Sequence, residues 1–186
     1  MKRTFGWHFV GERLHNGEPI PPDGKWLIWK GPLVMCTSGL HVGITPWDAL
    51  QYAPGSTLCF IEYGGEMFSQ ADKHCCRRRR IIARMDATEM LRYFARMRAL
   101  SVSHLWADTD DLNDLVLDYF MTGNPDTRVS AWASARDSAR DSAWASARES
   151  AWASARDSAW ASARNEFNAL VYECFEGPMR GVNFKP

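Results

Sequence analysis

The residues best suited to chemistry in this sequence lie in its first half. His41 stands in Ser-Gly-Leu-His-Val-Gly, where the flanking glycines would let a ligand approach the backbone closely. A neutral imidazole at this position could bind a phosphate, a ribose hydroxyl or a metal, or act as a base. The alternative interpretation is a core or turn histidine whose hydrogen bonds are satisfied within the protein.

Four further side chains join His41 as candidates. His8 lies between Trp7 and Phe9, and in a strand it would point away from both aromatic residues, so a structural role is the alternative. Two members of the Arg77–Arg80 run could hold a phosphate or carboxylate, although such runs are usually solvated. The candidate ligand-binding residues are His8, His41, Tyr52, Arg77 and Arg79.

The sequence gives weaker support to other kinds of site. Glu62, between Ile61 and Tyr63, is expected on the solvent side of an alternating strand. A zinc site would have to use His74-Cys75-Cys76 with more distant cysteines, and no C-x-x-C or H-x-x-x-H pair supports it. We find no phosphate loop, nucleophile elbow or paired catalytic carboxylates. No metal is therefore predicted, and no catalytic residue can be named.

Composition narrows the range of partners. Lys and Arg together number 22, as do Asp and Glu, so the chain has no net field that would favour nucleic acid or an anionic membrane. Hydrophobic residues make up 46%, enough for a real core. No secretory leader and no apolar run of transmembrane length is visible, and the five cysteines have no framework spacing. These features predict a reduced, cytoplasmic protein.

The first 123 residues are expected to form an α+β head. Frequent Gly and Pro in residues 1–35 favour short strands separated by turns. Thr45 is expected to cap a helix that has Pro46 in its first turn. Glu62 and the basic run would lie on later strands of a small mixed or antiparallel sheet. Strands are predicted over residues 4–10, 25–29, 32–36, 40–42 and 56–64.

Two helices are expected to follow within the head. Asp86-Ala-Thr-Glu89 is a capping box for a helix that continues to about Arg98. Apolar residues at helical spacing predict a second helix over residues 109–121. The break at Gly123–Pro125 is interpreted as the domain boundary, and Asp126 or Thr127 is expected to cap the next helix.

Residues 130–164 repeat the tetrad Ser-Ala-(Trp or Arg)-(Ala, Asp or Glu). Ala is the best helix former, and no Gly or Pro interrupts the run, so the tract is predicted to be one long helix. It would serve as a spacer or as a surface for a partner or for homo-oligomers. Nucleic acid is not an expected partner, because acids nearly cancel the Arg charge. The predicted organisation is a head over 1–123, a repeat helix over 124–164, and an amphipathic helix and tail over 165–186.

The stretch from Cys36 to Asp72-Lys73 resembles a family of uncharacterised bacteriophage proteins. The shared pattern is Cys36-Thr-Ser-Gly-Leu-His41, a Pro46-led helix containing Tyr52, a strand ending in Gly-Glu, and Asp-Lys. The resemblance covers roughly residues 25–90. It implies a phage or prophage accessory protein that acts in the bacterial cytoplasm, and it brings no activity with it.

A second pattern is similar to the ADP-ribosyltransferase fold. Trp7-His8 looks like its first NAD-binding motif, and Gly39-Leu40-His41-Val42 with the segment around Tyr52 is similar to its second. The resemblance implies that His8 would contact the nicotinamide ribose and that Tyr52 would stack near the nicotinamide. The catalytic glutamate of that fold has no clear match.

Three functional hypotheses follow. In the first, the head binds a host factor or a nucleotide-like ligand without catalysis, a role compatible with counter-defence, and the repeat helix acts as a spacer or supplies oligomer contacts. In the second, the chain is an enzyme that uses NAD as an ADP-ribosyltransferase does. In the third, it is a structural component of an oligomeric particle. The first hypothesis requires no bound cofactor, and it is the one that the sequence favours.

Overall fold

The computed structural model describes residues 3–14, 16–101, 114–127 and 149–180. The chain divides into two compact units. The sheet unit comprises Met1–Thr88 and Arg164–Pro186, and the helical unit comprises Glu89–Ala163. The divisions fall after Thr88 and before Arg164, so Gly123 lies inside the helical unit. The segment from Arg164 belongs with the strands of the first 88 residues.

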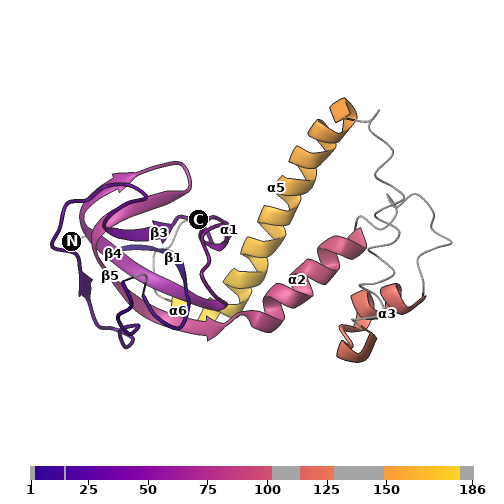
Figure 1. Cartoon of the computed structure of the whole chain (residues 1–186), viewed down its shortest axis with the longest axis horizontal. Helices are drawn as coiled ribbons and strands as arrows, with labels where there is room; N and C mark the ends of the chain where they lie inside the picture. Colours follow the sequence, from indigo (N-terminus) through magenta and orange to yellow (C-terminus); the bar gives the residue numbers. More distant parts are fainter. Residues whose placement is uncertain (1–2, 15, 102–113, 128–148, 181–186) are drawn as a thin grey trace. The chain divides into compact units, whose positions relative to one another are not determined.

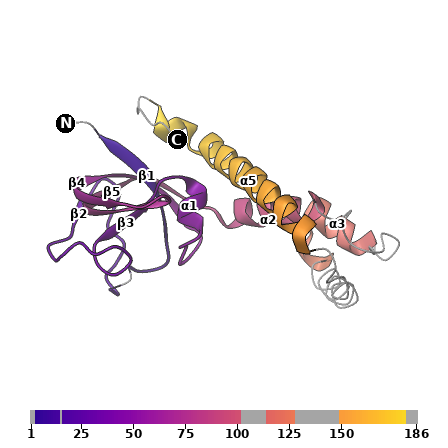
Figure 2. The same ribbon diagram turned by 90° about the horizontal axis from the view of Figure 1, so that it is seen from above.

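Five antiparallel strands form the sheet of the first unit (Figures 1 and 2). β1 pairs with both β3 and β4, and β5 also pairs with both, so these four strands close into a cycle. β2 is added at the edge of β5. The predicted α+β class with an antiparallel sheet is confirmed. The strands are β1 (Thr4–Val10), β2 (Leu27–Ile28), β3 (Leu40–Gly43), β4 (Thr57–Ser69) and β5 (Lys73–Asp86).

Three of the predicted strands differ from those observed. The strand expected over residues 25–29 is only Leu27–Ile28, where it pairs with β5. The strand expected over residues 32–36 is a turn, because the Val34 and Ser38 backbones bond to each other. The strand expected to end at residue 64 continues as β4 to Ser69, since β5 pairs with it beyond a bulge.

A short helix, α1 (Pro46–Leu50), begins as expected. Thr45 Oγ1 accepts the Asp48 N–H at 3.2 Å, and the Asp48 carboxylate accepts the Thr45 N–H at 3.0 Å. This reciprocal capping box satisfies donors that the first turn leaves without partners. Pro46 occupies the first turn, where its missing N–H costs nothing.

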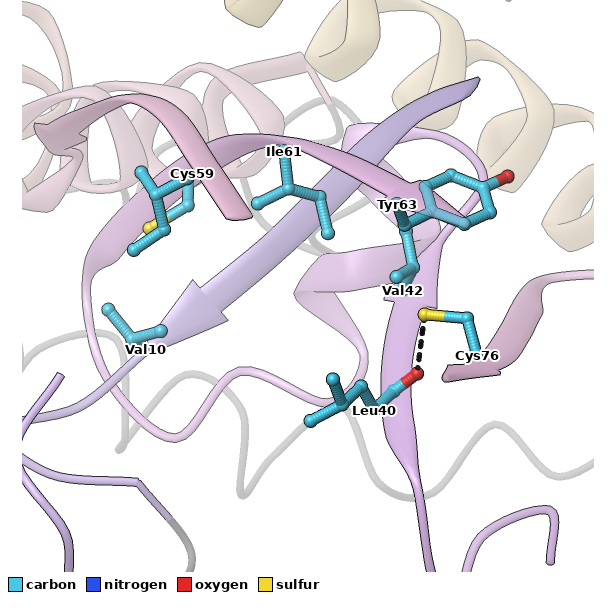
Figure 3. Close-up of a cluster of buried hydrophobic side chains, with 8 residues drawn as sticks. Val10, Leu40, Val42, Cys59, Ile61, Tyr63 and Cys76 are labelled. Atoms are coloured by element: carbon cyan, nitrogen blue, oxygen red, sulfur yellow. Dashed lines mark hydrogen bonds between the residues drawn. The ribbon is translucent and has the colours of Figure 1, made fainter. Parts of the chain in front are cut away.

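One side of the sheet carries an aliphatic core. Its buried members come from all four long strands: Val10, Leu40, Val42, Cys59, Ile61, Tyr63, Cys76 and Ile81 (Figure 3). The Cys76 thiol donates to the Leu40 carbonyl at 3.2 Å. Ile20, Leu27 and Trp29 pack against this core from outside. The core therefore holds the strands together on the side that also carries His8 and Arg79.

Aromatic residues and the C-terminal helix cover the other side. Trp7 is fully buried, with its ring 5.1 Å from Phe60 and 5.1 Å from Phe175. Phe167 is also fully buried and lies edge-on to Trp47. The predicted apolar stripe of the C-terminal helix thus packs on the core of this unit, through Phe167, Val171 and Phe175.

The C-terminal helices differ from expectation at their ends. α5 (Glu149–Cys174) contains the tetrads from Ser150 onward, while residues 130–148 lie outside the described residues. The expected stop at Gly177-Pro178 is wrong, because both residues lie within a further turn, α6 (Glu176–Met179). Proline is tolerated there, since the first turn of a helix needs no N–H from it.

The helical unit contains α2 (Thr88–Ser101) and α3 (Asp114–Thr122). Asp86 accepts the Thr88 N–H at 2.9 Å, so the predicted acid does lie at the start of α2. After Gly123, which has a φ of 72°, helical backbone resumes at residue 125. Asn124, rather than Asp126 or Thr127, accepts the first free N–H there.

Candidate functional site

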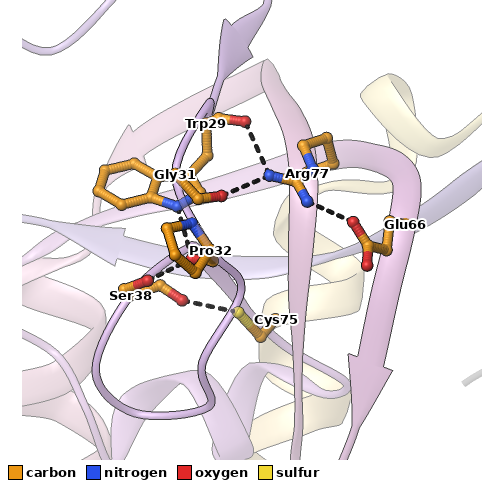
Figure 4. Close-up of polar contacts among 7 residues, drawn as sticks. All are labelled: Trp29, Gly31, Pro32, Ser38, Glu66, Cys75 and Arg77. Carbon is orange, nitrogen blue, oxygen red and sulfur yellow. Dashed lines mark hydrogen bonds and ion pairs between the residues drawn. The ribbon is translucent and has the colours of Figure 1, made fainter.

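The arginines of β5 differ in their partners, and this difference defines the candidate site. Arg77 is held on both sides (Figure 4). Its guanidinium donates to the Gly31 carbonyl at 2.6 Å and pairs with Glu66. It therefore fixes the loop after β2 against the β4–β5 hairpin. Both terminal nitrogens of Arg77 already donate to acceptors within the protein. The structure therefore does not favour the predicted role of Arg77 in ligand binding.

Arg78 and Arg80 both lie against one indole. Their guanidinium carbons are 4.8 and 4.7 Å from the ring centre of Trp26. Arg80 also donates to Glu62 at 2.7 Å, and Glu62 receives a second ion pair from Arg3 at 2.8 Å. The hydrogen bond from Arg3, followed by that from Arg80, lowers the Glu62 pKa despite its burial.

The expected solvent exposure of Glu62 is therefore wrong. Glu62 is 7% exposed, because the face of β4 that carries it is covered. Strand alternation correctly separated it from Ile61 and Tyr63, but both sides of this strand are buried. A carboxylate can be buried there because two arginines neutralise it.

Arg79 has a different environment from its neighbours. Its guanidinium donates to the main-chain carbonyl of His41, and no carboxylate partner is found for it among the described residues. The Arg79 side chain is half-buried, and desolvation lowers its pKa to about 10, while the Cys76 and Cys59 thiols act in the opposite direction. The side chain also lines a pocket.

This pocket lies on the aliphatic side of the sheet unit, and we call it the Arg79 pocket. Its free volume, about 20 Å³, holds little more than one water molecule. Only three ionisable side chains line it. Its walls are His8, Val10, Leu14, Ile20, Pro21, Leu27, Ile61, Arg79, Arg80 and Ile81.

His8 shares the Arg79 pocket. Burial, with smaller contributions from Arg79 and His41, lowers its pKa well below the ordinary value of 6.5. It is therefore a neutral imidazole at pH 7 and adds no charge to the pocket. β1 places it there because strand alternation points His8 and Val10 to the side opposite Trp7 and Phe9.

His41 does not line the Arg79 pocket but borders it through its backbone. Its Nε2 accepts the Cys36 N–H at 3.0 Å, so this nitrogen is unprotonated. Burial, Arg79 and Lys73 lower the pKa of His41, which favours the same neutral form. The imidazole holds the turn at Cys36, whose φ is 63°, and the structure thus gives His41 a positioning role.

Tyr52 belongs to a separate polar cluster. Its hydroxyl donates to Asp72 at 2.6 Å, and the Lys73 ammonium lies 4.0 Å from its ring centre. Hydrogen bonds with Tyr52 and then with Cys36 raise the Lys73 pKa. This cluster ties the end of α1 to the turn between β4 and β5. Hydrogen bonds and ring contacts link five residues in this region: Cys36, His41, Tyr52, Asp72 and Lys73.

Sequence reasoning thus named two pocket residues, His8 and Arg79, but missed the walls. Leu14, Ile20 and Pro21 come from a Gly- and Pro-rich loop without periodicity, so no pattern marked them. Lys73 was visible in the sequence only as part of the Asp-Lys pair. The described residues contain no group of three or more metal-binding side chains, and none of their helices is long and apolar enough to span a membrane.

The comparisons with known proteins found one family match. No curated protein and no solved structure matches the chain. Residues 6–93, just under half of the chain, match the model of a family described as a domain of unknown function (DUF7666). The matched stretch contains every wall of the Arg79 pocket and the Tyr52 cluster. Over these residues the chain is similar to a domain family whose function is unknown.

Proposed function

We propose that the sheet unit is a binding module that takes a small organic anion into the Arg79 pocket without catalysing a reaction. The observation that carries this proposal is Arg79 itself. A half-buried guanidinium that is partly desolvated and has no anionic partner costs free energy that the fold must supply elsewhere. An anion that enters the pocket would offset this cost through a charge-assisted hydrogen bond to Arg79.

The other β5 arginines support this interpretation by contrast. Arg77, Arg80 and Arg84 each pair with a carboxylate, and Arg78 stacks on Trp26. The chain thus supplies a partner for its other cations on this strand. Among the described arginines of β5, only Arg79 has a backbone carbonyl as its sole hydrogen-bond partner. We infer that the missing partner comes from outside the chain.

A non-catalytic role fits the chemistry of the pocket. His8 is neutral, but the pocket walls include no carboxylate, thiol or hydroxyl that could act with it. As part of the proposal, the bacteriophage resemblance suggests that binding occurs in the cytoplasm of a bacterial host, where sequestering a ligand would serve counter-defence. The tetrad tract would provide a spacer or an oligomer surface.

Binding can be tested with the full chain by isothermal titration calorimetry against small carboxylates and phosphates. We expect one site per chain, abolished in Arg79→Met and retained in Arg92→Met. Arg92 pairs with Glu89 on α2 and lies outside the pocket, so the second variant controls for the loss of one positive charge. Failure of all anions to bind the wild-type chain would refute the proposal.

The rival hypothesis, an NAD-dependent transferase, can be tested in parallel. His8 lines the Arg79 pocket, whereas Tyr52 belongs to the separate cluster, so the two residues implied by that resemblance do not share the pocket. Incubation with labelled NAD and a bacterial lysate is expected to give no label transfer. Transfer that is lost in His8→Ala would replace the binding proposal with the enzymatic one.

The role of the tetrad tract needs an internal deletion. The segment from Arg164 belongs to the sheet unit, so a chain ending at Gly123 would damage that unit. Deleting residues 130–145 removes whole tetrads and keeps the rest of the sequence in phase. We expect unchanged ligand binding, and sedimentation of this variant tests whether the removed tetrads affect the oligomeric state.

A further inference from the structure

We propose that the anion taken by the Arg79 pocket is a monocarboxylate with a short branched aliphatic chain. This inference rests on the proposed function and narrows its ligand class. The lining gives three separate constraints: its charge, the form of the guanidinium and the aliphatic walls. Each constraint excludes a class of small anion that a solitary arginine would otherwise accept.

The first constraint is charge. A phosphate monoester carries close to two negative charges at pH 7 and three strong acceptor oxygens, so its sites usually combine several cations or a helix N-terminus. Here Arg80 already serves Glu62, and His8 donates no charge in its neutral form. No helix end is among the pocket walls. A single guanidinium remains, and one carboxylate matches its charge.

The second constraint is the form of the guanidinium. One of its terminal nitrogens donates to the His41 carbonyl, which fixes the orientation of the fork. A planar fork held in this way matches two coplanar carboxylate oxygens better than the tetrahedral oxygens of a phosphate. Neutral His8 adds one donor or acceptor beside the carboxylate, depending on its tautomer.

The third consideration is the body of the ligand. Apart from His8, the arginines and Pro21, the pocket walls are all aliphatic: Val10, Leu14, Ile20, Leu27, Ile61 and Ile81. No Phe, Tyr or Trp side chain lines the pocket to stack on a nucleobase, so the nucleotide-like ligand expected from the sequence suits these walls poorly. The free volume of about 20 Å³ excludes a long chain. Leu14 and Ile20 would have to move outward to admit the short stem.

The test compares ligands that differ in one part only, by calorimetry on the full chain. The four probes are 3-methylbutanoate, acetate, 3-methylbutanamide and 3-methylbutyl phosphate. We expect 3-methylbutanoate to bind at least tenfold more tightly than the other three. Acetate lacks the stem, the amide lacks the charge, and the phosphate ester keeps the stem but changes the headgroup.

The variants separate this inference from the proposed function. Binding of 3-methylbutanoate should fall at least tenfold in Arg79→Met and in Arg79→Gln, and remain within about twofold in Arg92→Met, with folding checked by circular dichroism. Tighter Arg79-dependent binding of the phosphate ester or of acetate would overturn the inference but keep the anion-binding function. Binding that survives both Arg79 substitutions, or the absence of any binding, would overturn both.

Discussion

The two sides of the sheet unit are built from the same strands but treat their charges differently. The side around Trp7, the covered side, is closed by the C-terminal segment. The buried carboxylate of Glu62 is neutralised by Arg3 and Arg80. On the pocket side, Arg79 has only a backbone carbonyl and the pocket, which Arg80 also lines. Under the proposed function, the covered side and the Glu62 ion pairs serve stability, whereas Arg79 retains a cost that a ligand can offset.

The largest expected effect comes from opening the covered side. Phe167→Ala removes a fully buried ring beside Trp47, so we expect a loss of about 3–5 kcal/mol in the free energy of unfolding, measured by urea denaturation. Glu173→Ala, on an exposed position of the same helix, should change it by less than about 0.5 kcal/mol. Similar values for the two variants would contradict the covered-side assignment.

A smaller loss is expected from the buried carboxylate. Glu62→Gln leaves Arg80 without its anionic partner and should cost about 1–3 kcal/mol in the same assay. Glu66→Gln removes the partner of Arg77, but Glu66 is exposed, so the expected cost is below about 1 kcal/mol. If Glu66→Gln proves the more damaging change, the structural role given to Glu62 is wrong.

The pocket side should respond to pH through His8. Its folded-state pKa is lowered, so below about pH 6.5 the unfolded chain binds more protons and stability falls as the pH falls. One such group changes the free energy of unfolding by at most about 1.4 kcal/mol per pH unit. Urea midpoints at about pH 6.5 and about pH 5.5 should therefore differ less in His8→Asn than in the wild-type chain. An equal difference in both chains would argue against a buried neutral His8.

The smallest effect on stability is expected at Arg79 itself. Replacing a buried charge that lacks an anionic partner with a residue of similar length is commonly neutral or stabilising. Without ligand, we expect Arg79→Met to unfold at the same urea midpoint or to gain up to about 1 kcal/mol. Arg80→Met, the adjacent control, should be destabilised because Glu62 then loses a partner. A clear loss for Arg79→Met would assign Arg79 a structural role and remove the contrast between the two sides.

Local patterns in the sequence predicted most of the elements. Alternation identified β1, the Thr45–Pro46 pair identified the start of α1, and helical spacing identified the apolar face that ends α5. Each depends on residues close together in the chain. The turn near Val34 was mistaken for a strand because its closing bond to Ser38 leaves no mark on the apolar pattern.

The site was harder to predict because its properties depend on distant partners. The four consecutive arginines look equivalent in the sequence, and only Trp26, Glu62, Glu66 and Gly31 distinguish them. Residue type was enough to propose His8 and Arg79 as candidates. It could not predict the pocket they share, because three of its walls, Leu14, Ile20 and Pro21, come from the loop before β2. The contact between Tyr52 and Lys73 likewise depends on how β4 and β5 turn.

The sheet unit is completed by the last part of the chain, and this affects how the protein is made. Residues 4–86 supply the five strands of the sheet unit. Phe167 and Phe175, which pack on the side around Trp7, are synthesised only after the whole repeat tract. Because segments fold as they leave the ribosome, a large apolar surface stays uncovered during that interval. A gain or loss of whole tetrads should delay or advance this final step, because the tract takes longer or shorter to synthesise. Equilibrium stability should change little, since the entropy of loop closure rises only slowly with the length of the intervening segment.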